Sequence, residues 1–147
     1  MRGALIVALG LWLMTATGAA AQTADPQVST EIVARGDLDY SDAVDGPATV
    51  YIGTIEMSPG SSYAGWHTHP GPVWVVVTSG ELALYGSDGC RSTYPEGTAY
   101  LAEPNTPYDL RNETDQPLHL HFAGLIPAGQ RPTVPARGPA ASCEPSA

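Results

Sequence analysis

Two of the four histidines in this chain are separated by a single residue, in the segment GWHTHPGPVWVVVT. If this segment is extended, His67 and His69 point to the same face and lie about 7 Å apart along the strand. Both imidazoles can then reach one metal ion, and imidazole is a suitable ligand for Zn, Cu, Fe and Ni. Two ligands alone make a weak site, because useful sites have three or four. A metal-binding pair and a polar rim at the start of a strand are therefore both open interpretations.

The elements that must position these histidines are predicted to be short strands. Stretches rich in β-branched and apolar residues alternate with turn signals such as SPGSS, SGE, GSDGC and NETDQP. No convincing amphipathic helical pattern follows the first 21 residues. This spacing is typical of an all-β sandwich or barrel. The predicted strands cover residues 48–57, 73–78, 81–85, 98–103, 108–112 and 118–126.

Both ends of the chain are predicted to lie outside the barrel. The N-terminal segment carries Arg2, a short apolar core and the small residues 19–21, a combination typical of a cleaved signal peptide. The apolar core is shorter than the roughly 20 residues that span a bilayer. The C-terminal segment is rich in Pro and Ala and lacks periodicity. We expect a signal peptide at 1–21, a leader and edge strand at 22–47, the barrel at 48–127 and a tail at 128–147.

The chain has two cysteines, Cys90 and Cys143, and both follow the predicted signal peptide. An even number of cysteines in an oxidising compartment favours a disulfide, with two free thiols as the alternative. Such a disulfide would tie the tail back to the loop that holds Cys90. In the chain-entropy model it would contribute roughly 4 kcal/mol to the free energy of unfolding.

The formal net charge is −9, and every basic residue is arginine. An acidic protein without a basic patch is a poor candidate for binding nucleic acid, and anionic membrane surfaces would repel it. Together with the signal peptide, this charge predicts an exported protein, periplasmic or secreted. It would act on small molecules, metals or other proteins.

The segment HTHPGPVWVVVTSGEL resembles the first motif of the cupins, with His-x-His, Pro-Gly and a strand that ends at Gly80. YLAEPNTPYDLRN resembles the second motif, with Pro104 and Asn112 in register. The resemblance runs from about Val50 to Pro127 and is closest to small, exported, single-domain cupins. It implies a jelly-roll β-barrel that usually carries a divalent metal. Cupins include dioxygenases, isomerases, storage proteins and binding modules, so this fold does not specify the function.

The metal shell that the resemblance implies, three histidines and one glutamate, is incomplete in this chain. His67 and His69 match two positions, but the glutamate position holds Val73 and the third histidine position holds Tyr108. A tyrosine is a poor substitute, because its unperturbed pKa is near 10. We therefore expect an ion of Fe, Mn, Ni, Cu or Zn to bind weakly or not at all.

A replacement ligand could come from the last strand, which carries the other two histidines. If residues 108–112 and 118–126 form a hairpin, Tyr108 lies opposite His121 and both point inward. His121 would then join the pair, whereas His119 is a weaker candidate. The apolar residues of that strand would normally occupy the core instead, and a slip of one residue exchanges the two faces. Both registers are open.

The function favoured by these residues is the binding of a divalent metal, a small organic ligand or both. One alternative is a metal-dependent cupin enzyme of the dioxygenase or isomerase type, in which His121 or Tyr108 completes the histidine pair. The other is a non-catalytic structural barrel that forms a homodimer. No catalytic residue can be assigned from the sequence. The predicted pocket lining is Val73, Val75, Val77, Tyr100 and Tyr108.

Overall fold

All regular elements in the described part of the protein are β-strands. The computed structural model describes residues 27–140 and Cys143, and no helix occurs in this part of the chain. The prediction of an all-β fold is therefore confirmed. The strands are β1 (Val28–Ser41), β2 (Gly46–Met57), β3 (Ser62–Thr68), β4 (Val73–Ser79), β5 (Glu81–Tyr85), β6 (Arg91–Pro95), β7 (Ala99–Ala102), β8 (Tyr108–Arg111), β9 (Leu118–Pro127) and β10 (Val134–Pro135).

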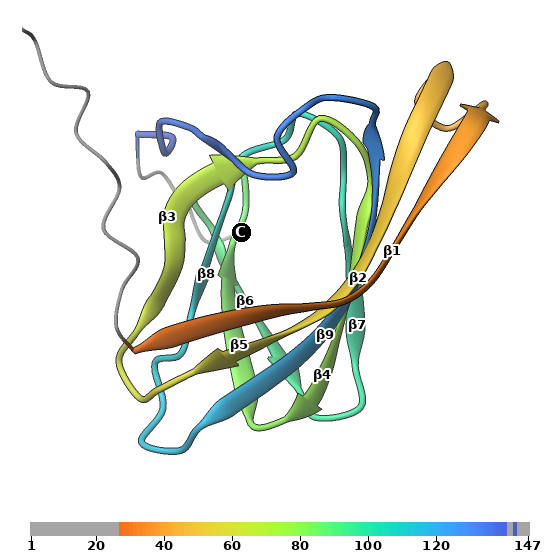
Figure 1. The fold of residues 1–147 in the computed structure, drawn as a ribbon. Helices are drawn as coiled ribbons and strands as arrows, with labels where there is room; N and C mark the ends of the chain where they lie inside the picture. Colours follow the sequence, from red (N-terminus) through yellow and green to blue (C-terminus); the bar gives the residue numbers. More distant parts are fainter. Residues whose placement is uncertain (1–26, 141–142, 144–147) are drawn as a thin grey trace, which may run out of the picture.

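The strands form two five-stranded antiparallel sheets that face each other across one core (Figure 1). The strand order is β1-β2-β9-β4-β7 in the first sheet and β10-β3-β8-β5-β6 in the second. Strands that are distant in sequence, such as β2 and β9, lie side by side. Paired sheets with such crossovers are the architecture of a jelly-roll barrel.

Strand β4 shows how the sequence fills this core. Val73, Val75 and Val77 are at most 6% exposed, whereas Trp74 and Val76 between them are 46% and 41% exposed. The side chains of a strand point alternately to its two faces, so the run of apolar residues divides into an inner and an outer set. The inner set forms part of the core between the two sheets.

The N-terminal edge strand is longer than the sequence indicates. The sequence predicts a leader and an edge strand over 22–47, and within this range β1 is a continuous strand of 14 residues. It pairs with β2 along its length, with irregularities between Ile32 and Ala34 and between Leu38 and Ser41. Most of its side chains are exposed, so burial imposes no alternating pattern that a sequence reading could detect.

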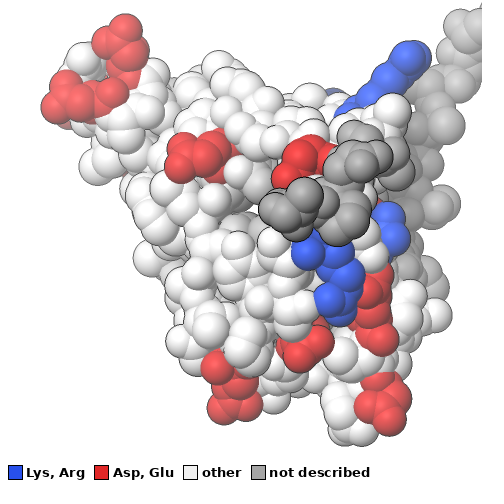
Figure 2. Space-filling view, turned by 180° about the vertical axis from the view of Figure 1, so that it is seen from behind, with Lys and Arg blue, Asp and Glu red and all other residues white. Residues whose placement is uncertain are grey.

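The β1–β2 hairpin extends beyond the barrel (Figure 1), and acidic side chains gather at its tip (Figure 2). Near this tip the Tyr40 hydroxyl donates a hydrogen bond to the carboxylate of Asp45, which has a φ of 51°. The acidic tip lies on a surface with scattered charges (Figure 2).

The hairpin considered between residues 108–112 and 118–126 does not form, because the two strands belong to different sheets. β8 pairs with β3 and β5, whereas β9 pairs with β2 and β4. Leu118 and Leu120 are fully buried and His121 is exposed. The apolar residues of β9 therefore occupy the core. This is the alternative in which the last strand turns its histidines outward.

Asn112 holds the connection between these two strands. Its side-chain amide donates hydrogen bonds to the carbonyls of Met57 (3.0 Å) and Gln116 (2.8 Å). Its side-chain carbonyl accepts from the backbone N–H and the hydroxyl of Thr114. Asn112 has no exposed surface, and a buried amide is stable only when its donors and acceptors are paired.

The C-terminal segment 128–140, hereafter the tail strap, folds back across the open end of the barrel (Figure 1). Its strand β10 pairs with β3 through Val134 opposite Thr68 and Pro135 opposite His67. The N–H of Ala136 donates to the carbonyl of Trp66 at 2.9 Å. The strap therefore contacts the strand that carries the histidine pair.

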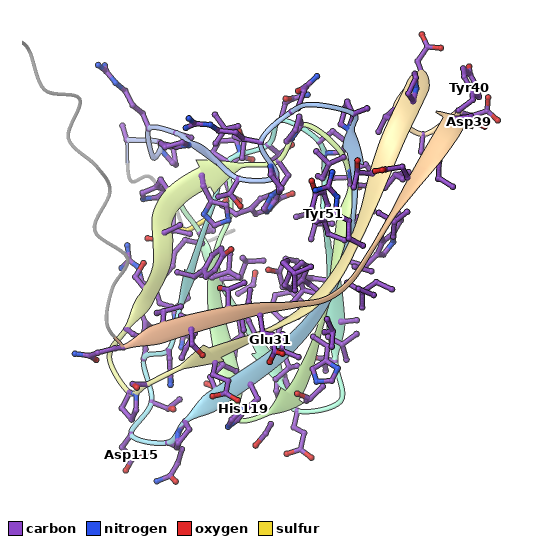
Figure 3. All side chains as sticks on the ribbon, in the orientation of Figure 1. Glu31, Asp39, Tyr40, Tyr51, Asp115 and His119 are labelled. Atoms are coloured by element: carbon purple, nitrogen blue, oxygen red, sulfur yellow. A yellow bond between two sulfur atoms is a disulfide. The ribbon has the colours of Figure 1, made fainter. Side chains whose placement is uncertain are left out.

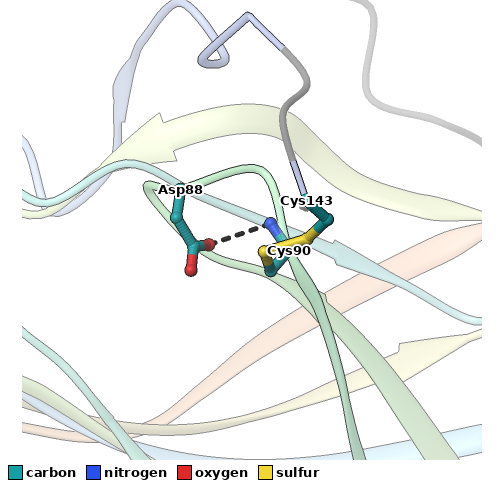
Figure 4. Close-up of a disulfide and its surroundings, with 3 residues drawn as sticks. All are labelled: Asp88, Cys90 and Cys143. Atoms are coloured by element: carbon teal, nitrogen blue, oxygen red, sulfur yellow. Dashed lines mark hydrogen bonds between the residues drawn. A yellow bond between two sulfur atoms is a disulfide. The ribbon is translucent and has the colours of Figure 1, made fainter. Parts of the chain in front are cut away.

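A disulfide between Cys90 and Cys143 fixes the chain beyond the strap to the loop between β5 and β6 (Figure 4). In that loop, the backbone N–H of Cys90 donates to the carboxylate of Asp88 at 2.8 Å. The two cysteines are 53 residues apart in sequence. This bond closes the tail onto the barrel.

The predicted signal peptide at 1–21 lies outside the described residues. Among the residues that the structure describes, none belongs to a helix of sufficient length and apolarity to span a membrane.

Candidate functional site

Beneath the tail strap lies a cavity of about 390 Å³ that opens between the two sheets. It is lined by β1, β2, β3, β4, β8, β9 and the strap. Tyr51 of β2 is one of its walls, near the open end of the barrel (Figure 3). His67 and His69 are its two histidines, and Arg131 and Thr133 belong to the strap. The apolar lining residues are Ile32, Ile55, Val73, Leu110, Phe122 and Ile126.

His67 is the most buried polar group of this cavity, with 1% of its surface exposed. Its Nδ1–H donates to the carbonyl of Gly65 at 2.7 Å. A carbonyl can only accept, so this contact fixes the proton on Nδ1 of the neutral ring. The other nitrogen, Nε2, is buried and has no hydrogen-bond partner among the described residues. An unpaired buried polar atom is costly and requires an explanation.

His69 is oriented in the same way by a partner that is distant in sequence. Its Nδ1–H donates to the carbonyl of Pro132 at 2.7 Å. The ring centroids of His69 and His67 are 5.0 Å apart, with an angle of 77° between the ring planes. Both imidazoles therefore have Nδ1 hydrogen-bonded to the backbone and Nε2 free to act as an acceptor or as a metal ligand.

A bulge in β3 places His67 against Tyr63. Tyr63 pairs with Leu110 and His67 pairs with Tyr108, so three residues of β3 lie opposite one residue of β8. Ala64 and Gly65 inside the bulge have φ values of 56° and 63°. Bulges of this kind redirect side chains, and the rings of Tyr63 and His67 meet edge to face at a centroid distance of 5.4 Å.

Burial keeps the two imidazoles neutral. It lowers the pKa of His67 from 6.5 to about 4, against a smaller opposing effect of the hydrogen bond to Gly65. The pKa of His69 is also lowered, mainly by burial, against the hydrogen bond to Pro132. A neutral imidazole is the form that binds metals and accepts hydrogen bonds, so both rings are in this form at neutral pH.

The predicted lining residues are divided between three surroundings. Val73 lines the cavity, whereas Val75 and Val77 are buried in the core. Tyr100 and Tyr108 line a separate hollow beside the β5–β6 loop. Burial raises the pKa of Tyr100.

Tyr108 does not complete the histidine pair. It is the ladder partner of His67, but it is not among the described residues that line the cavity. Its hydroxyl accepts a hydrogen bond from the backbone N–H of Glu103 at 3.1 Å. The hydroxyl is therefore already used in the link between β7 and β8.

The other two histidines also lie outside the cavity. His121 is exposed on the outer face of the first sheet, opposite the exposed Val76. His119 lies near the start of β9, away from the strap (Figure 3), with its Nδ1 3.6 Å from the carboxylate of Glu56. The alternation of β9 that buries Leu120 excludes both histidines from the interior.

The two imidazoles supply two of the four protein ligands in the metal shell that the cupin resemblance implies. Their free Nε2 atoms and their Nδ1–H contacts to carbonyls are the arrangement of metal-binding histidines, whose second nitrogen is usually held by an outer partner. The described residues contain no group of three or more His, Cys, Asp or Glu side chains that could hold an ion. An ion at this position would be held by His67 and His69, with water or a bound ligand in its remaining positions.

The charge of the cavity differs from that of the whole protein. The chain has a net charge of −9, but none of the described residues that line the cavity is Asp or Glu. Arg131 is the charged residue of the lining, and no carboxylate among the described residues pairs with it. The cavity is therefore apolar, with a cationic group on the strap.

Sequence reasoning missed several parts of this site. Gly65 inside a strand pattern is a bulge signal that would have indicated the proximity of Tyr63 and His67. Nothing in the aperiodic tail indicates that Arg131 and the carbonyl of Pro132 reach the cavity. That placement depends on the folding back of the strap.

The family model described as "Cupin domain" matches residues 53–124, which include the histidine pair and the bulge. Residues 53–124 form a cupin domain, and the chain belongs to the cupin superfamily. The resemblance inferred from the two motifs is thereby confirmed. A curated relative of this cupin, H2HPP isomerase of Bacillus subtilis, is 36% identical over 69 residues. The aligned part is 47% of this chain and 29% of that relative.

Solved structures share the fold of this cupin at low sequence identity. The polyketide cyclase RemF of Streptomyces resistomycificus has a TM-score of 0.58 and 16% identity, over 78% of this chain and 75% of that one. A Klebsiella pneumoniae protein with a double-stranded β-helix domain has a TM-score of 0.55 and 16% identity, over 79% and 90%. A cupin superfamily protein of Desulfitobacterium hafniense has 0.53 and 14%, over 72% and 84%. These likenesses support the fold alone.

Proposed function

We propose that this cupin is an exported protein that binds a small, largely apolar organic molecule in the cavity beneath the tail strap. His67 and His69 are the polar anchors of that molecule, and of a divalent metal ion where one accompanies it. The observation that carries this proposal is the buried Nε2 atom of His67, which has no partner among the described residues. A bound hydroxyl, N–H group or metal ion would satisfy it.

The dimensions and composition of the cavity support an organic ligand. Ligand pockets usually have volumes of roughly 300–1,000 Å³ and apolar walls with a few fixed polar groups. The cavity here is about 390 Å³, and its walls include Phe122, Leu110 and Ile126. Two histidines with fixed tautomers supply the polar groups.

Metal binding is the weaker half of the proposal. The histidine pair supplies two of the three or four protein ligands that a stable site needs, since the other two family positions hold Val73 and Tyr108. We therefore expect weak binding of an ion such as Zn, Ni, Cu, Fe or Mn. A bound ion would supply a Lewis acid at the inner end of the cavity.

Export is supported by the disulfide between Cys90 and Cys143, because disulfides persist in oxidising compartments. The predicted signal peptide at 1–21 supports the same location, periplasmic or secreted.

A metal-dependent enzyme acting on a small molecule is the second candidate. The similarity to the Bacillus subtilis isomerase, 36% identity over 69 residues, favours it. An enzyme of this type requires an ion that stays bound through purification. A binding protein with half a shell does not retain one, so the metal content of protein purified without chelators distinguishes the two candidates.

Calorimetric titration of chelator-treated protein with 2-naphthol tests the binding proposal. Its fused ring suits the apolar walls, and its hydroxyl can donate to an imidazole Nε2. We expect one bound molecule per chain and a loss of affinity of about tenfold in His67→Leu, from the loss of one buried hydrogen bond. His121→Leu, a change on the outer face, is the matched control and should bind as the wild type does. Equal affinity in His67→Leu and His121→Leu would overturn the proposal.

A further inference from the structure

The polar end of the cavity requires a hydrogen-bond donor from its ligand. Both Nδ1–H groups are committed to carbonyls, that of His67 to Gly65 and that of His69 to Pro132. In the neutral ring the remaining Nε2 carries a lone pair and cannot donate. A hydroxyl or an N–H group of the ligand satisfies this nitrogen, whereas a carboxylate placed there would face a lone pair.

The strap side of the cavity favours the opposite chemistry. Arg131 belongs to the strap, is exposed, lines the cavity and has no ion-pair partner among the described residues. Thr133 lines the cavity beside it. Guanidinium groups bind carboxylates through charge-assisted hydrogen bonds, about twice as strong as neutral ones. An anionic group of the ligand therefore fits at the strap.

The absence of acidic residues from the described lining disfavours a cationic ligand. An ammonium group could also donate to the two imidazoles. It would enter a cavity whose described lining includes Arg131 and no carboxylate. Burying an unpaired charge costs several kcal/mol, so the cavity disfavours amines.

Around these polar groups, which the strap brings together through Pro132 and Arg131, the other walls are apolar. Phe122 and Ile126 of β9 lie on one sheet, and Leu110 and Tyr63 lie on the other. A flat ring fits between facing sheets and gains the hydrophobic contribution of its buried surface.

We infer that the ligand is a small ring-containing hydroxy acid, a phenol or an enol with a carboxylate. Its hydroxyl donates to the buried imidazole pair, and its carboxylate binds Arg131 on the tail strap. This inference rests on the proposed function and specifies its ligand. It needs no metal ion, and it gives the strap a direct part in selecting the ligand.

The test is calorimetric titration of the full mature protein, treated with a chelator, with four related compounds. 6-Hydroxy-2-naphthoate carries both groups, 2-naphthol has the hydroxyl alone, and 2-naphthoate has the carboxylate alone. 4-Hydroxybenzoate serves as a shorter hydroxy acid. We expect one of the two hydroxy acids to bind about tenfold more tightly than 2-naphthol, as a charge-assisted hydrogen bond provides.

Variants of the strap and the imidazole signals show where the carboxylate and the hydroxyl of the ligand bind. Arg131→Gln should weaken binding of the hydroxy acid about tenfold and leave binding of 2-naphthol unchanged. Arg137→Gln is the matched control, because Arg137 is also an exposed arginine of the strap and does not line the cavity. Imidazole nitrogen NMR signals provide a readout independent of affinity, since Nε2 of His67 should shift when it accepts the ligand's hydroxyl.

The outcomes separate this inference from the proposed function. If 2-naphthol binds at least as tightly as both hydroxy acids, or Arg131→Gln has no effect on any compound, the ligand class is wrong while the organic-ligand site stands. If none of the compounds binds, the proposed function and this inference both fail. If only 2-naphthoate binds and Nε2 does not shift, the carboxylate binds without the imidazole pair and the assignment of the hydroxyl is overturned.

Discussion

The Nδ1–H of His69 donates to the carbonyl of Pro132 at 2.7 Å, across a separation of 63 residues. Through this contact the tail strap orients one of the two histidines that face the cavity. β10 adds a second connection, because it pairs with β3 at His67 and Thr68. The strap is thus both a wall of the cavity and a support of its histidine pair.

Removal of the disulfide should loosen the strap. The bond between Cys90 and Cys143 joins residues 53 apart in sequence, and loops of that size contribute about 2–4 kcal/mol to the free energy of unfolding. We expect Cys90→Ser/Cys143→Ser to lose stability in this range in urea unfolding. Wild-type protein under reducing conditions is the control and should show the same loss. A double variant as stable as the oxidised wild type would show that the strap is held without the disulfide.

Gly138→Ala should displace the strap without altering the disulfide. A Cβ atom at Gly138 would lie 2.5 Å from the indole of Trp66, too close for any side chain. We expect faster hydrogen exchange at the N–H of Ala136, which now donates to the carbonyl of Trp66. Gly36→Ala on β1 is the matched control, since a Cβ there meets nothing within 4 Å. Unchanged exchange at Ala136 would contradict the docking of the strap on Trp66.

The sequence predicted the barrel, an edge strand before it and the disulfide that ties the tail back, but it did not predict the length of β1 or the path of the tail strap. Alternation of buried and exposed residues, as in Val73 to Val77, marks the strands that face the core. The length of β1 was not predicted, because its exposed side chains carry no such pattern. The hairpin considered between β8 and β9 does not form. A polar connection of six residues can cross between two sheets as readily as it can join neighbouring strands.

The candidate site was predictable only where it lies on one strand. Side chains alternate between the two faces of a strand, and this alternation predicts that His67 and His69 point to the same face. The contributions of Tyr63, Arg131 and Pro132 depend on a bulge and on the returning tail, which bring together residues from separate parts of the chain. The long-range pairing that joins β3 to β8 and to β10 cannot be derived from local periodicity.

Stability should fall on acidification through His67. Its pKa is 6.5 in the unfolded chain and about 4 in the folded protein, so between these values the unfolded state binds more protons. The contribution of this group is complete above pH 6.5 and is lost as the pH falls toward 4, by on the order of 3 kcal/mol at most. His69, whose pKa is also lowered, acts in the same direction.

Urea unfolding of chelator-treated protein at about pH 7.5 and about pH 4.5 measures this effect. In His67→Gln the difference in unfolding free energy between the two pH values should shrink, whereas in His121→Gln it should not. An identical difference in wild type and His67→Gln would show that His67 titrates normally in the folded protein.

Asn112→Ala should be among the most damaging single changes in the chain. The side chain is fully buried and makes hydrogen bonds to Met57, Thr114 and Gln116. Its removal leaves the carbonyl of Met57 without that donor, at a cost of about 2–4 kcal/mol. Gln116→Ala, which keeps the backbone acceptor and alters an exposed side chain, is the control. A loss below about 1 kcal/mol in Asn112→Ala would contradict this role.

In the proposed function His67 and His69, and not the other two histidines, supply the polar groups of a binding cavity. The four histidines give four separate sets of imidazole nitrogen signals in long-range 15N–1H NMR spectra. A titration of chelator-treated protein with 2-naphthol therefore examines all four side chains in one experiment. We predict that the Nε2 signal of His67, His69 or both shifts to saturation at one molecule per chain, and that the signals of His119 and His121 stay in place. Shifts confined to His119 or His121, or no shift at saturating 2-naphthol, would contradict the account.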